Sequence, residues 1–525
     1  MKENTNKNED VKVINEHRIK FLSVGIVVLC SFVFYVSNST QSGLWYDEAV
    51  EYFYSKYLTG TVPGGFGTEN MFERIRYTYQ PPLYNVLMFI WLSITDSEFT
   101  YRLAGILITI IGSLGCYMAI EEVLPKGNWG IIGMLFYLYA PGVVYYGLEC
   151  AEYNLMLCFI AWMMFFYIRI LVRNDWKSLV CFFVFACLSV YSQYGSVFVV
   201  IGLYASILIF FVLNNKFVRL KQMINASVVT LVVAVLPLVA FFVIPQMKRQ
   251  NDFSISHEPF FTRGLLMDFF MGGKNVLSFL FGSIAVIGII VLIIACCLSL
   301  FLCPTIMSYP LIASVITWLL YFITVSCSYY GYNSWNSSSI GTMNIGGRYS
   351  LFFIPCIVVV LIVGLGLTSS MLKNTKYYKC ILLVTILSLT IYCAKEVYEV
   401  SVKGWVKDDI REVSSAWYEC EGYREKTLVH QWDDALFNYY LIHDNRYDKA
   451  YLDMIEVADI WIRSAEYSEM REGLLKMGFL SLKEYYYVTP GSGSYDVFLS
   501  VVADAGYSVK QIYNGNSHLL YLVKD

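Results

Sequence analysis

Two adjacent carboxylates, Asp47 and Glu48, follow closely after the first long apolar run of the chain. A carboxylate at the edge of a membrane is costly to desolvate, so such a pair requires a role or a partner. One such role is that of a general base that takes the proton of an incoming hydroxyl group. A second interpretation stays open, in which Asp47 only caps a short helix over Ala49–Leu58 that lies on the bilayer.

Two arginines, Arg102 and Arg348, lie where apolar segments begin, and Tyr349 follows the second of them. A guanidinium group can grip a phosphate through two parallel hydrogen bonds. Arg102, about one turn into its segment, can instead pair with a carboxylate or extend to water. Arg348 can instead be an anchor at the membrane interface.

Further polar and aromatic side chains gather at the same ends of the apolar segments. The candidates for acceptor or sugar binding are Gln80, Tyr84, Glu149, Glu152, Tyr153, Gln193, Tyr332 and Trp335. Glu149 and Glu152 are three residues apart, and two carboxylates that close would raise one pKa unless a cation or ligand intervened. The alternatives are a polar turn between helices for the glutamates and an aromatic belt for the loop of Tyr332 and Trp335.

Several chemistries find no support in the sequence. It contains no Walker loop, no dinucleotide-binding glycine pattern and no His-Glu-x-x-His motif. The five histidines are scattered, which argues against a structural zinc site. Of the 14 cysteines only Cys420 lies in a clearly polar segment, so no disulfide framework is expected. A net charge of -3 without a basic block argues against a nucleic-acid partner.

The elements that must position these residues are membrane helices. The chain is 57% hydrophobic and only 15% charged, whereas soluble domains carry about 25% charged residues. A membrane span needs about 20 apolar residues. The runs of suitable length are 21–38, 98–121, 129–147, 152–172, 178–192, 195–213, 224–244, 277–302, 306–327, 349–371 and 380–395. The run Pro82–Thr95 is too short and predicts a helix at the outer face that ends before Asp96.

The distribution of lysine and arginine predicts the orientation of these eleven spans. Basic residues gather at the N-terminus and in every second loop except the uncharged one near Pro304, for example at Lys126, at 216–221 and at 373–379. Such loops face the cytoplasm. The segments on the other side are then 39–97, 245–276, 328–348 and 396–525. The first apolar run lacks a cleavage site after it, so we expect an uncleaved span rather than a signal peptide.

The composition of the chain changes near Lys395, where charged residues become frequent. The pattern beyond it predicts a soluble α/β domain. Its expected elements are a strand at 427–431, helices at 434–442 and 468–478, a helix or strand at 497–503 and 506–512, and a strand at 519–523. The predicted organisation is therefore a cytoplasmic N-terminus (1–20), a membrane module (21–395) with a first outer loop (39–97), and an extracytoplasmic domain (396–525).

Taken in this order, the motifs resemble those of the GT-C glycosyltransferases, in the group of the protein O-mannosyltransferases and lipid A aminoarabinose transferases. The resemblance covers about residues 20–370. Its pieces are Asp47–Glu48, Gln80–Tyr84, Glu98–Leu103, Glu149–Tyr153, Tyr191–Tyr194 and Gly347–Tyr349.

The resemblance implies an α-helical, multi-pass enzyme of the cell membrane that moves a sugar from a polyprenyl-phosphate donor to a lipid, glycan or protein acceptor on the outer face. It also implies that Asp47 is the catalytic base, that Glu48 holds the acceptor or pairs with Arg102, and that Arg348 contacts the donor phosphate. No cofactor is implied, although two adjacent carboxylates can hold a divalent cation. The chain departs from the group in two places: an arginine is missing from the segment 149–153, and Gln193 replaces a histidine.

Two other functions compete with the enzyme. A transporter or flippase of a lipid-linked saccharide would carry its charged groups near the middle of the membrane, often with inverted repeats. Here the charges gather at one surface and no repeat is found. A membrane sensor or scaffold would use the C-terminal domain, but it leaves Asp47, Glu48 and Arg348 without a role.

Overall fold

The chain divides into two compact units that each combine distant parts of the sequence. The computed structural model describes residues 2–62, 70–76, 80–252, 265–282, 304–326, 347–371, 376–402, 409–430, 433–458, 466–490 and 495–525. The first unit is formed by residues 1–38, 75–84 and 102–403, and the second by residues 39–74, 85–101 and 404–525. The first outer loop thus groups with the C-terminal part of the chain.

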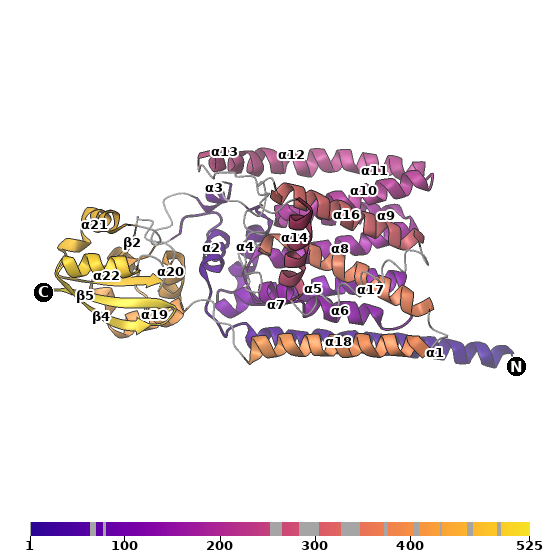
Figure 1. Cartoon of the computed structure of the whole chain (residues 1–525), viewed down its shortest axis with the longest axis horizontal. Coiled ribbons are helices and arrows are strands. Elements are labelled where there is room, and N and C mark those ends of the chain that lie inside the picture. Colours follow the sequence, from indigo (N-terminus) through magenta and orange to yellow (C-terminus); the bar gives the residue numbers. More distant parts are fainter. Residues whose placement is uncertain are drawn as a thin grey trace. The chain divides into compact units, whose positions relative to one another are not determined.

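The first unit is a bundle of helices, and its long apolar helices run largely side by side (Figure 1). They are α1 (Lys2–Asn38), α5 (Glu98–Val123), α6 (Trp129–Leu138), α7 (Pro141–Gly147), α8 (Glu152–Arg173), α9 (Trp176–Ser192), α10 (Val197–Leu213), α11 (Phe217–Thr230), α12 (Leu236–Leu238), α13 (Ile244–Asp252), α14 (Leu265–Phe281), α16 (Pro304–Ser326), α17 (Phe353–Met371) and α18 (Lys376–Ser401). Two π-helical turns, η2 (Leu231–Val235) and η3 (Val239–Val243), connect α11 through α12 to α13.

The bundle confirms the class of fold expected from the apolar runs. By length and composition, seven helices of the described chain are suited to cross a membrane, or eight if α6 and α7 count as one broken span. The predicted span 178–192 corresponds to α9, a shorter apolar helix, and 380–395 lies within α18. The predicted span 277–302 falls mostly outside the described residues, so the total of eleven stays a prediction.

The predicted span 129–147 is not one straight helix. It consists of α6 and α7, which are inclined by 59° to each other. Pro141 begins α7, and a proline cannot donate the hydrogen bond that would continue α6 through this point. The bend therefore follows from one residue inside an otherwise uniform apolar run.

Polar contacts and small residues join the helices of the bundle. The hydroxyl of Tyr35 in α1 donates to the carbonyl of Leu138 in α6 at 2.6 Å. Ser206 in α10 donates to the carbonyl of Tyr309 in α16 at 2.8 Å. Hydrogen bonds and close backbone approach replace the hydrophobic effect as the source of helix association in lipid.

The second unit contains a mixed five-stranded sheet with helices around it (Figure 1). Its strands are β1 (Thr427–Val429), β2 (Ile455–Val457), β3 (Glu484–Pro490), β4 (Tyr507–Asn514) and β5 (Ser517–Lys524), in the order β2-β1-β3-β5-β4. β1 is parallel to β2 and β3, and β5 is antiparallel to β3 and β4. Buried aromatic and aliphatic residues, such as Leu428, Tyr487 and Leu520, form the core.

The helices of the second unit come from both parts of the sequence. From the first outer loop come α2 (Tyr46–Lys56), α3 (Met71–Ile75) and most of α4 (Leu83–Ile94); from the C-terminal part come α19 (Ile410–Glu419), α20 (Asp434–His443), α21 (Tyr467–Lys476) and α22 (Tyr495–Asp504). α2 packs against α20. The short helix expected within 82–95 is α4, which ends before Asp96 as predicted.

Candidate active site

Asp47 and Glu48 lie in the first turn of α2 but have different surroundings. Glu48 is buried, with 1% of the residue's surface exposed, and its carboxylate accepts a hydrogen bond from the backbone N–H of Trp45 at 3.1 Å. Glu48 thus caps the start of α2, a role that the sequence had left open for Asp47. Asp47, rotated by about 100° around the helix, remains partly exposed. Of the two carboxylates, Asp47 is therefore the more accessible to a substrate.

A third carboxylate, Glu51, lies one turn beyond Asp47 and is buried. Its Oε2 accepts a hydrogen bond from the Nδ2 of Asn85 in α4 at 2.7 Å. Asn85 also donates to Ser55 at 3.3 Å. The contact fixes α2 against α4, so Glu51 has a structural role. The sequence carries one signal for this residue, a glutamate within the aromatic stretch 50–54.

The end of the first outer loop is held by a polar cluster around Asp96. Its carboxylate accepts from the Tyr52 hydroxyl at 2.8 Å and pairs with Lys56 at 2.6 Å. His443 of α20 contacts Asp96 at 3.5 Å and the Tyr52 hydroxyl at 3.2 Å. Burial alone would raise the pKa of Asp96, but the hydrogen bonds from His443, Lys56 and Tyr52 outweigh it and hold the pKa well below its usual range.

Asp434, at the start of α20, brings a further carboxylate to the surroundings of α2. Burial raises the pKa of Asp434 to about 6, while the backbone N–H of Ala435 and the charge of Arg74 oppose this shift. Burial, followed by the charge of Asp434, also raises the pKa of Tyr46, the residue before Asp47. The sequence carries one signal for Asp434: the pair Asp433–Asp434 begins two residues after the end of the predicted strand 427–431.

In the first unit, Arg348 lies among aromatic rings. It belongs to the short helical turn η4 (Gly347–Ser350), which packs against α14. Its guanidinium carbon is 5.9 Å from the ring centre of Tyr153 and 5.4 Å from that of Tyr349. Tyr153 in turn contacts Tyr146 with a ring separation of 5.0 Å. The structure therefore brings Tyr153 together with Arg348 and Tyr349, which lie almost 200 positions further along the sequence.

α5, which carries Arg102, touches the backbone of Glu149 in the connection between α7 and α8. A Cβ placed on Gly105, three residues after Arg102, would lie 3.3 Å from the carbonyl oxygen of Glu149 and 3.0 Å from the side chain of Asn154. The same carbonyl accepts a hydrogen bond from Asn154 at 3.1 Å. Arg102 and Glu149 are both buried, as is Glu152 at the first position of α8. Arg102 is thus buried and does not extend to water.

A buried amide, that of Gln246 in α13, contacts Gln80 and Tyr194, the residue that follows Gln193. Gln246 donates to the carbonyl of Gln80 at 3.0 Å and accepts from the hydroxyl of Tyr194 at 2.9 Å. Gln193 ends α9, and its side-chain oxygen accepts the N–H of Gly195. Both glutamines thus have identifiable structural contacts, and their proposed substrate roles stay predictions.

The remaining candidates are Tyr84, Tyr332 and Trp335. Tyr84 is buried in the first unit. Tyr332 and Trp335 lie outside the described residues. In the part of the chain that is described, no three His, Cys, Asp or Glu side chains are grouped closely enough to hold a metal ion. The described candidates form two groups, with Asp47 and Glu48 in the second unit and the others in the first.

Comparison with known proteins confirms the resemblance seen in the motifs. Residues 79–241 match the family described as dolichyl-phosphate-mannose-protein mannosyltransferase. No curated protein sequence gives a significant match.

Two solved structures have the same fold over nearly the whole chain. ArnT from Cupriavidus metallidurans in the apo state has a TM-score of 0.56 at 12% identity, covering 97% of this chain and 98% of ArnT. The same protein bound to undecaprenyl phosphate has a TM-score of 0.55 at 11% identity, covering 95% and 97%. The chain thus has the fold of a GT-C membrane glycosyltransferase, with a C-terminal domain built on a sheet.

Proposed function

We propose that the chain is a glycosyltransferase that takes its sugar from a polyprenyl-phosphate donor and transfers it to a lipid, glycan or protein acceptor at the outer face of the cell membrane. The observation that carries this proposal is the match over nearly the full length of both chains to ArnT, whose solved structure holds undecaprenyl phosphate. The family match over residues 79–241 independently supports a lipid-phosphate sugar donor.

In the proposed reaction, Asp47 takes the proton of the acceptor hydroxyl. The acceptor oxygen then forms a bond to the anomeric carbon, the bond from that carbon to the phosphate oxygen breaks, and polyprenyl phosphate leaves with the bonding electrons. A single displacement of this kind inverts the anomeric centre. The partial exposure of Asp47 beside the buried Glu48 supports Asp47 as the base.

The leaving phosphate requires a positive charge, and Arg348 is our candidate. Its guanidinium group lies beside the rings of Tyr153 and Tyr349, which restrict its orientation. An ordered guanidinium group can form two hydrogen bonds to a phosphate with little further loss of freedom. Arg102, buried one turn into α5, is our second candidate for organising this region.

Binding of undecaprenyl phosphate to the purified chain tests the donor assignment. The full chain in detergent should bind this lipid saturably when binding is followed by native mass spectrometry. Hydrogen bonds to charged groups contribute about 1.5–3 kcal/mol, so Arg348→Ala should weaken binding by about tenfold to a hundredfold. Arg446→Ala is the matched control, because Arg446 is exposed and pairs locally with Asp444.

The transfer itself is tested in cells. Mass spectrometry of surface lipids and glycans should reveal a missing sugar in a deletion strain, restored by the wild-type gene and not by Asp47→Asn. A chain that binds no undecaprenyl phosphate and whose deletion leaves surface sugars unchanged would contradict the proposal.

A further inference from the structure

Two residues of the C-terminal part of the chain contact the backbone that leads into α2. Arg411, in α19, donates from Nη2 to the carbonyl of Ser42 at 3.1 Å and from Nη1 to the carbonyl of Thr40 at 3.4 Å. The hydroxyl of Tyr440, in α20, accepts the N–H of Leu44 at 2.5 Å. Leu44 is three residues before Asp47, so these contacts hold the backbone segment that determines the position of Asp47.

Glu98 connects the two residues into one assembly. Its carboxylate pairs with Nη2 of Arg411 at 2.6 Å and accepts from the Tyr440 hydroxyl at 3.3 Å. The Arg411 guanidinium carbon also lies 5.8 Å from the centre of the Tyr440 ring. We call Arg411, Tyr440 and Glu98 the loop clamp. Because each of them contacts another member and Arg411 and Tyr440 hold the backbone, removing one weakens the whole set.

A second contact between α20 and α2 limits rotation of the helix that carries Asp47. Tyr52, about 7.5 Å along α2 from Asp47, packs edge-to-face on Tyr439 with ring centres 4.8 Å apart. The Tyr52 hydroxyl also meets His443 at 3.2 Å. α20 therefore holds the entry to α2 through Tyr440 and the middle of α2 through Tyr439 and His443.

We propose that Arg411 and Tyr440 are positioning residues for the transfer reaction, and that the C-terminal domain thereby forms part of the catalytic apparatus. The proposal rests on the proposed function in so far as Asp47 is the base. Its physical basis is that a general base acts only within hydrogen-bond reach of its proton, so a displacement of about 1 Å is enough to slow the reaction. A polar, directional clamp is suited to prevent such a displacement.

Amide hydrogen exchange of the full-length protein, measured by mass spectrometry, tests the clamp without reference to activity. Tyr440→Phe keeps the ring and removes the acceptor of the Leu44 N–H, and Arg411→Gln replaces the guanidinium group that reaches two carbonyls by a shorter, uncharged amide. In both variants, exchange of peptides within 40–50 should become at least tenfold faster. Peptides of β4 and β5 should exchange as in the wild type, which shows that the sheet is intact.

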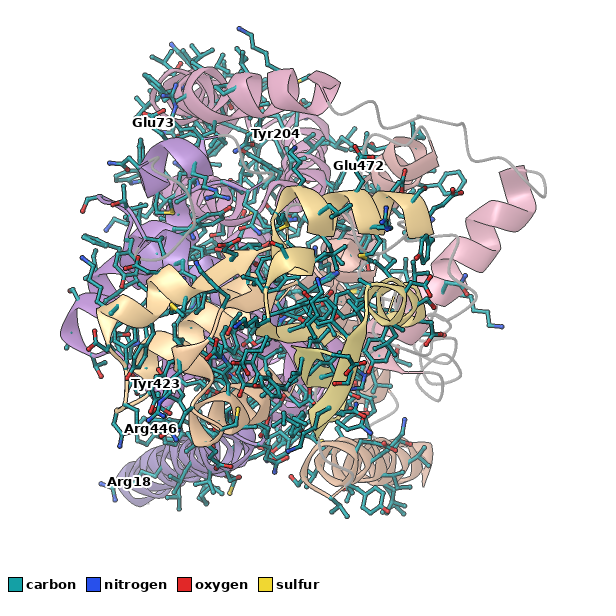
Figure 2. The ribbon with its side chains drawn as sticks, turned by 90° about the vertical axis from the view of Figure 1, so that its left-hand side faces the viewer. Arg18, Glu73, Tyr204, Tyr423, Arg446 and Glu472 are labelled. Carbon is teal, nitrogen blue, oxygen red and sulfur yellow. The ribbon has the colours of Figure 1, made fainter. Side chains whose placement is uncertain are left out.

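The matched controls are two neighbouring residues of the same domain. Tyr423→Phe changes a tyrosine that stacks on Tyr451, with ring centres 4.6 Å apart. Arg424→Gln changes an exposed arginine that pairs with Glu421. Figure 2 labels Tyr423 on this part of the chain. Both controls change residues outside the loop clamp, so both should leave exchange within 40–50 and turnover unchanged.

The second measurement separates positioning from a purely structural role. Per molecule of folded protein, Tyr440→Phe and Arg411→Gln should lower kcat about tenfold, while the affinity for undecaprenyl phosphate stays within twofold of the wild type. Arg411→Lys, which keeps the charge but not the fork, should recover part of the loss. Wild-type exchange and wild-type kcat in both Tyr440→Phe and Arg411→Gln would overturn the proposal, as would faster exchange with unchanged kcat.

A failure of the proposed function would give other results than a failure of the positioning role. A wild-type protein without transferase activity would contradict the function, while faster exchange in the two variants would still establish that the clamp holds the loop. An active wild type with equally active clamp variants would contradict the positioning role alone.

Discussion

At the scale of single residues, Asp47 and Glu48 show how adjacent carboxylates acquire different roles. The helix turn directs Glu48 back to the N–H of Trp45, where it is buried, and leaves Asp47 partly exposed. The Tyr101 hydroxyl donates to the carbonyl of Glu48 at 3.4 Å and adds to the fixation of this turn. A fixed turn with one accessible carboxylate is what a general base requires.

Asp47→Asn is the first prediction at this scale. General-base assistance contributes about 10²–10⁴-fold, so turnover should fall within that range. The substitution is nearly isosteric, so expression, thermal stability and binding of undecaprenyl phosphate should remain close to the wild type. Glu48→Gln should lower turnover less, since its amide oxygen can still accept the Trp45 N–H. Full activity of Asp47→Asn would show that the base lies elsewhere.

The second prediction concerns the pH dependence of stability and rests on Asp434. Its pKa is raised to about 6 in the folded protein, against about 3.9 in an unfolded chain. The folded state therefore binds the proton more tightly, and this stabilisation is present below about pH 4 and is lost as the pH rises through 6. The change amounts to something on the order of 2–3 kcal/mol.

Thermal unfolding of the full chain in detergent between pH 5 and 7.5 measures this dependence. Asp434→Asn should unfold at a higher temperature than the wild type at pH 7.5 and show a smaller difference between the two pH values. Asp444→Asn should instead unfold at a lower temperature than the wild type at both pH values, because hydrogen bonds from Arg446 stabilise the ionised Asp444 and lower its pKa. An Asp434→Asn protein less stable than the wild type at pH 7.5 would contradict the prediction.

Sequence reasoning found residues that carry unusual charges in apolar surroundings, and it missed those that depend on a distant partner. Asp47 was noticed because it follows an apolar run. The role of Glu48 as a cap could not be separated from a role for Asp47, since both depend on helix geometry. Arg411 and Tyr440 gave no local signal, because their significance comes from contacts more than 300 positions away along the chain.

At the scale of elements, the crossing of α5 and α8 depends on glycine. A Cβ on Gly115 would lie 2.9 Å from the backbone carbon of Ala161 and 2.9 Å from the backbone nitrogen of Trp162. A Cβ on Gly112 would lie 3.0 Å from the Cα of Cys158. These are backbone atoms, which cannot move aside as a side chain can. The two helices therefore approach as closely as small residues permit.

Gly115→Ala is the prediction that follows. In a helix that lacked such a neighbour, alanine would be more favourable than glycine by about 1 kcal/mol. Here the added methyl group must separate the helices, at a cost of about 1–3 kcal/mol, so the melting temperature should fall. Gly25→Ala in α1 is the control, because nothing lies within 4 Å of the new atom. A melting temperature that is unchanged or raised in Gly115→Ala would contradict this packing.

The elements themselves were predicted well wherever one local pattern dominated. α20 and α21 lie within two residues of their expected ranges, and Gly478, with a φ of +80°, follows the end of α21. The alternatives left at 497–512 resolve into α22 followed by β4. Two strands are absent from the sequence prediction: β3, although its run of tyrosines is typical of a strand, and β2, which has only three residues.

At the scale of the whole molecule, the sequence separates into membrane and soluble segments, but the structure groups residues by contact. The change in composition near Lys395 predicts a boundary there, and the C-terminal unit resumes at 404. The grouping of residues 39–74 and 85–101 with this unit was not predictable, because it arises from contacts such as Arg411 with Glu98. A linear composition profile contains no information about such long-range pairs.

The orientation in the membrane is the last prediction, and it follows from the basic residues. If loops rich in lysine and arginine face the cytoplasm, single cysteines introduced by Lys126→Cys and Lys216→Cys should react with a membrane-impermeant maleimide only after the cells are opened. Cys420, which follows α19 and is only partly buried, should react in intact cells. The native cysteines must be replaced for the first two measurements.

The control for Cys420 accounts for its contacts within the fold. Its thiol donates to the carbonyl of Trp417 at 3.4 Å, so slow labelling alone does not show that it is on the inner side. Labelling is therefore repeated on two samples. One is denatured protein in opened cells, and the other is intact cells treated with a denaturant that leaves the membrane sealed. If Cys420 then reacts only once the membrane is broken, the C-terminal domain faces the cytoplasm. In that case the positive charges do not set the orientation, and Asp47, which belongs to the same unit, cannot act at the outer face.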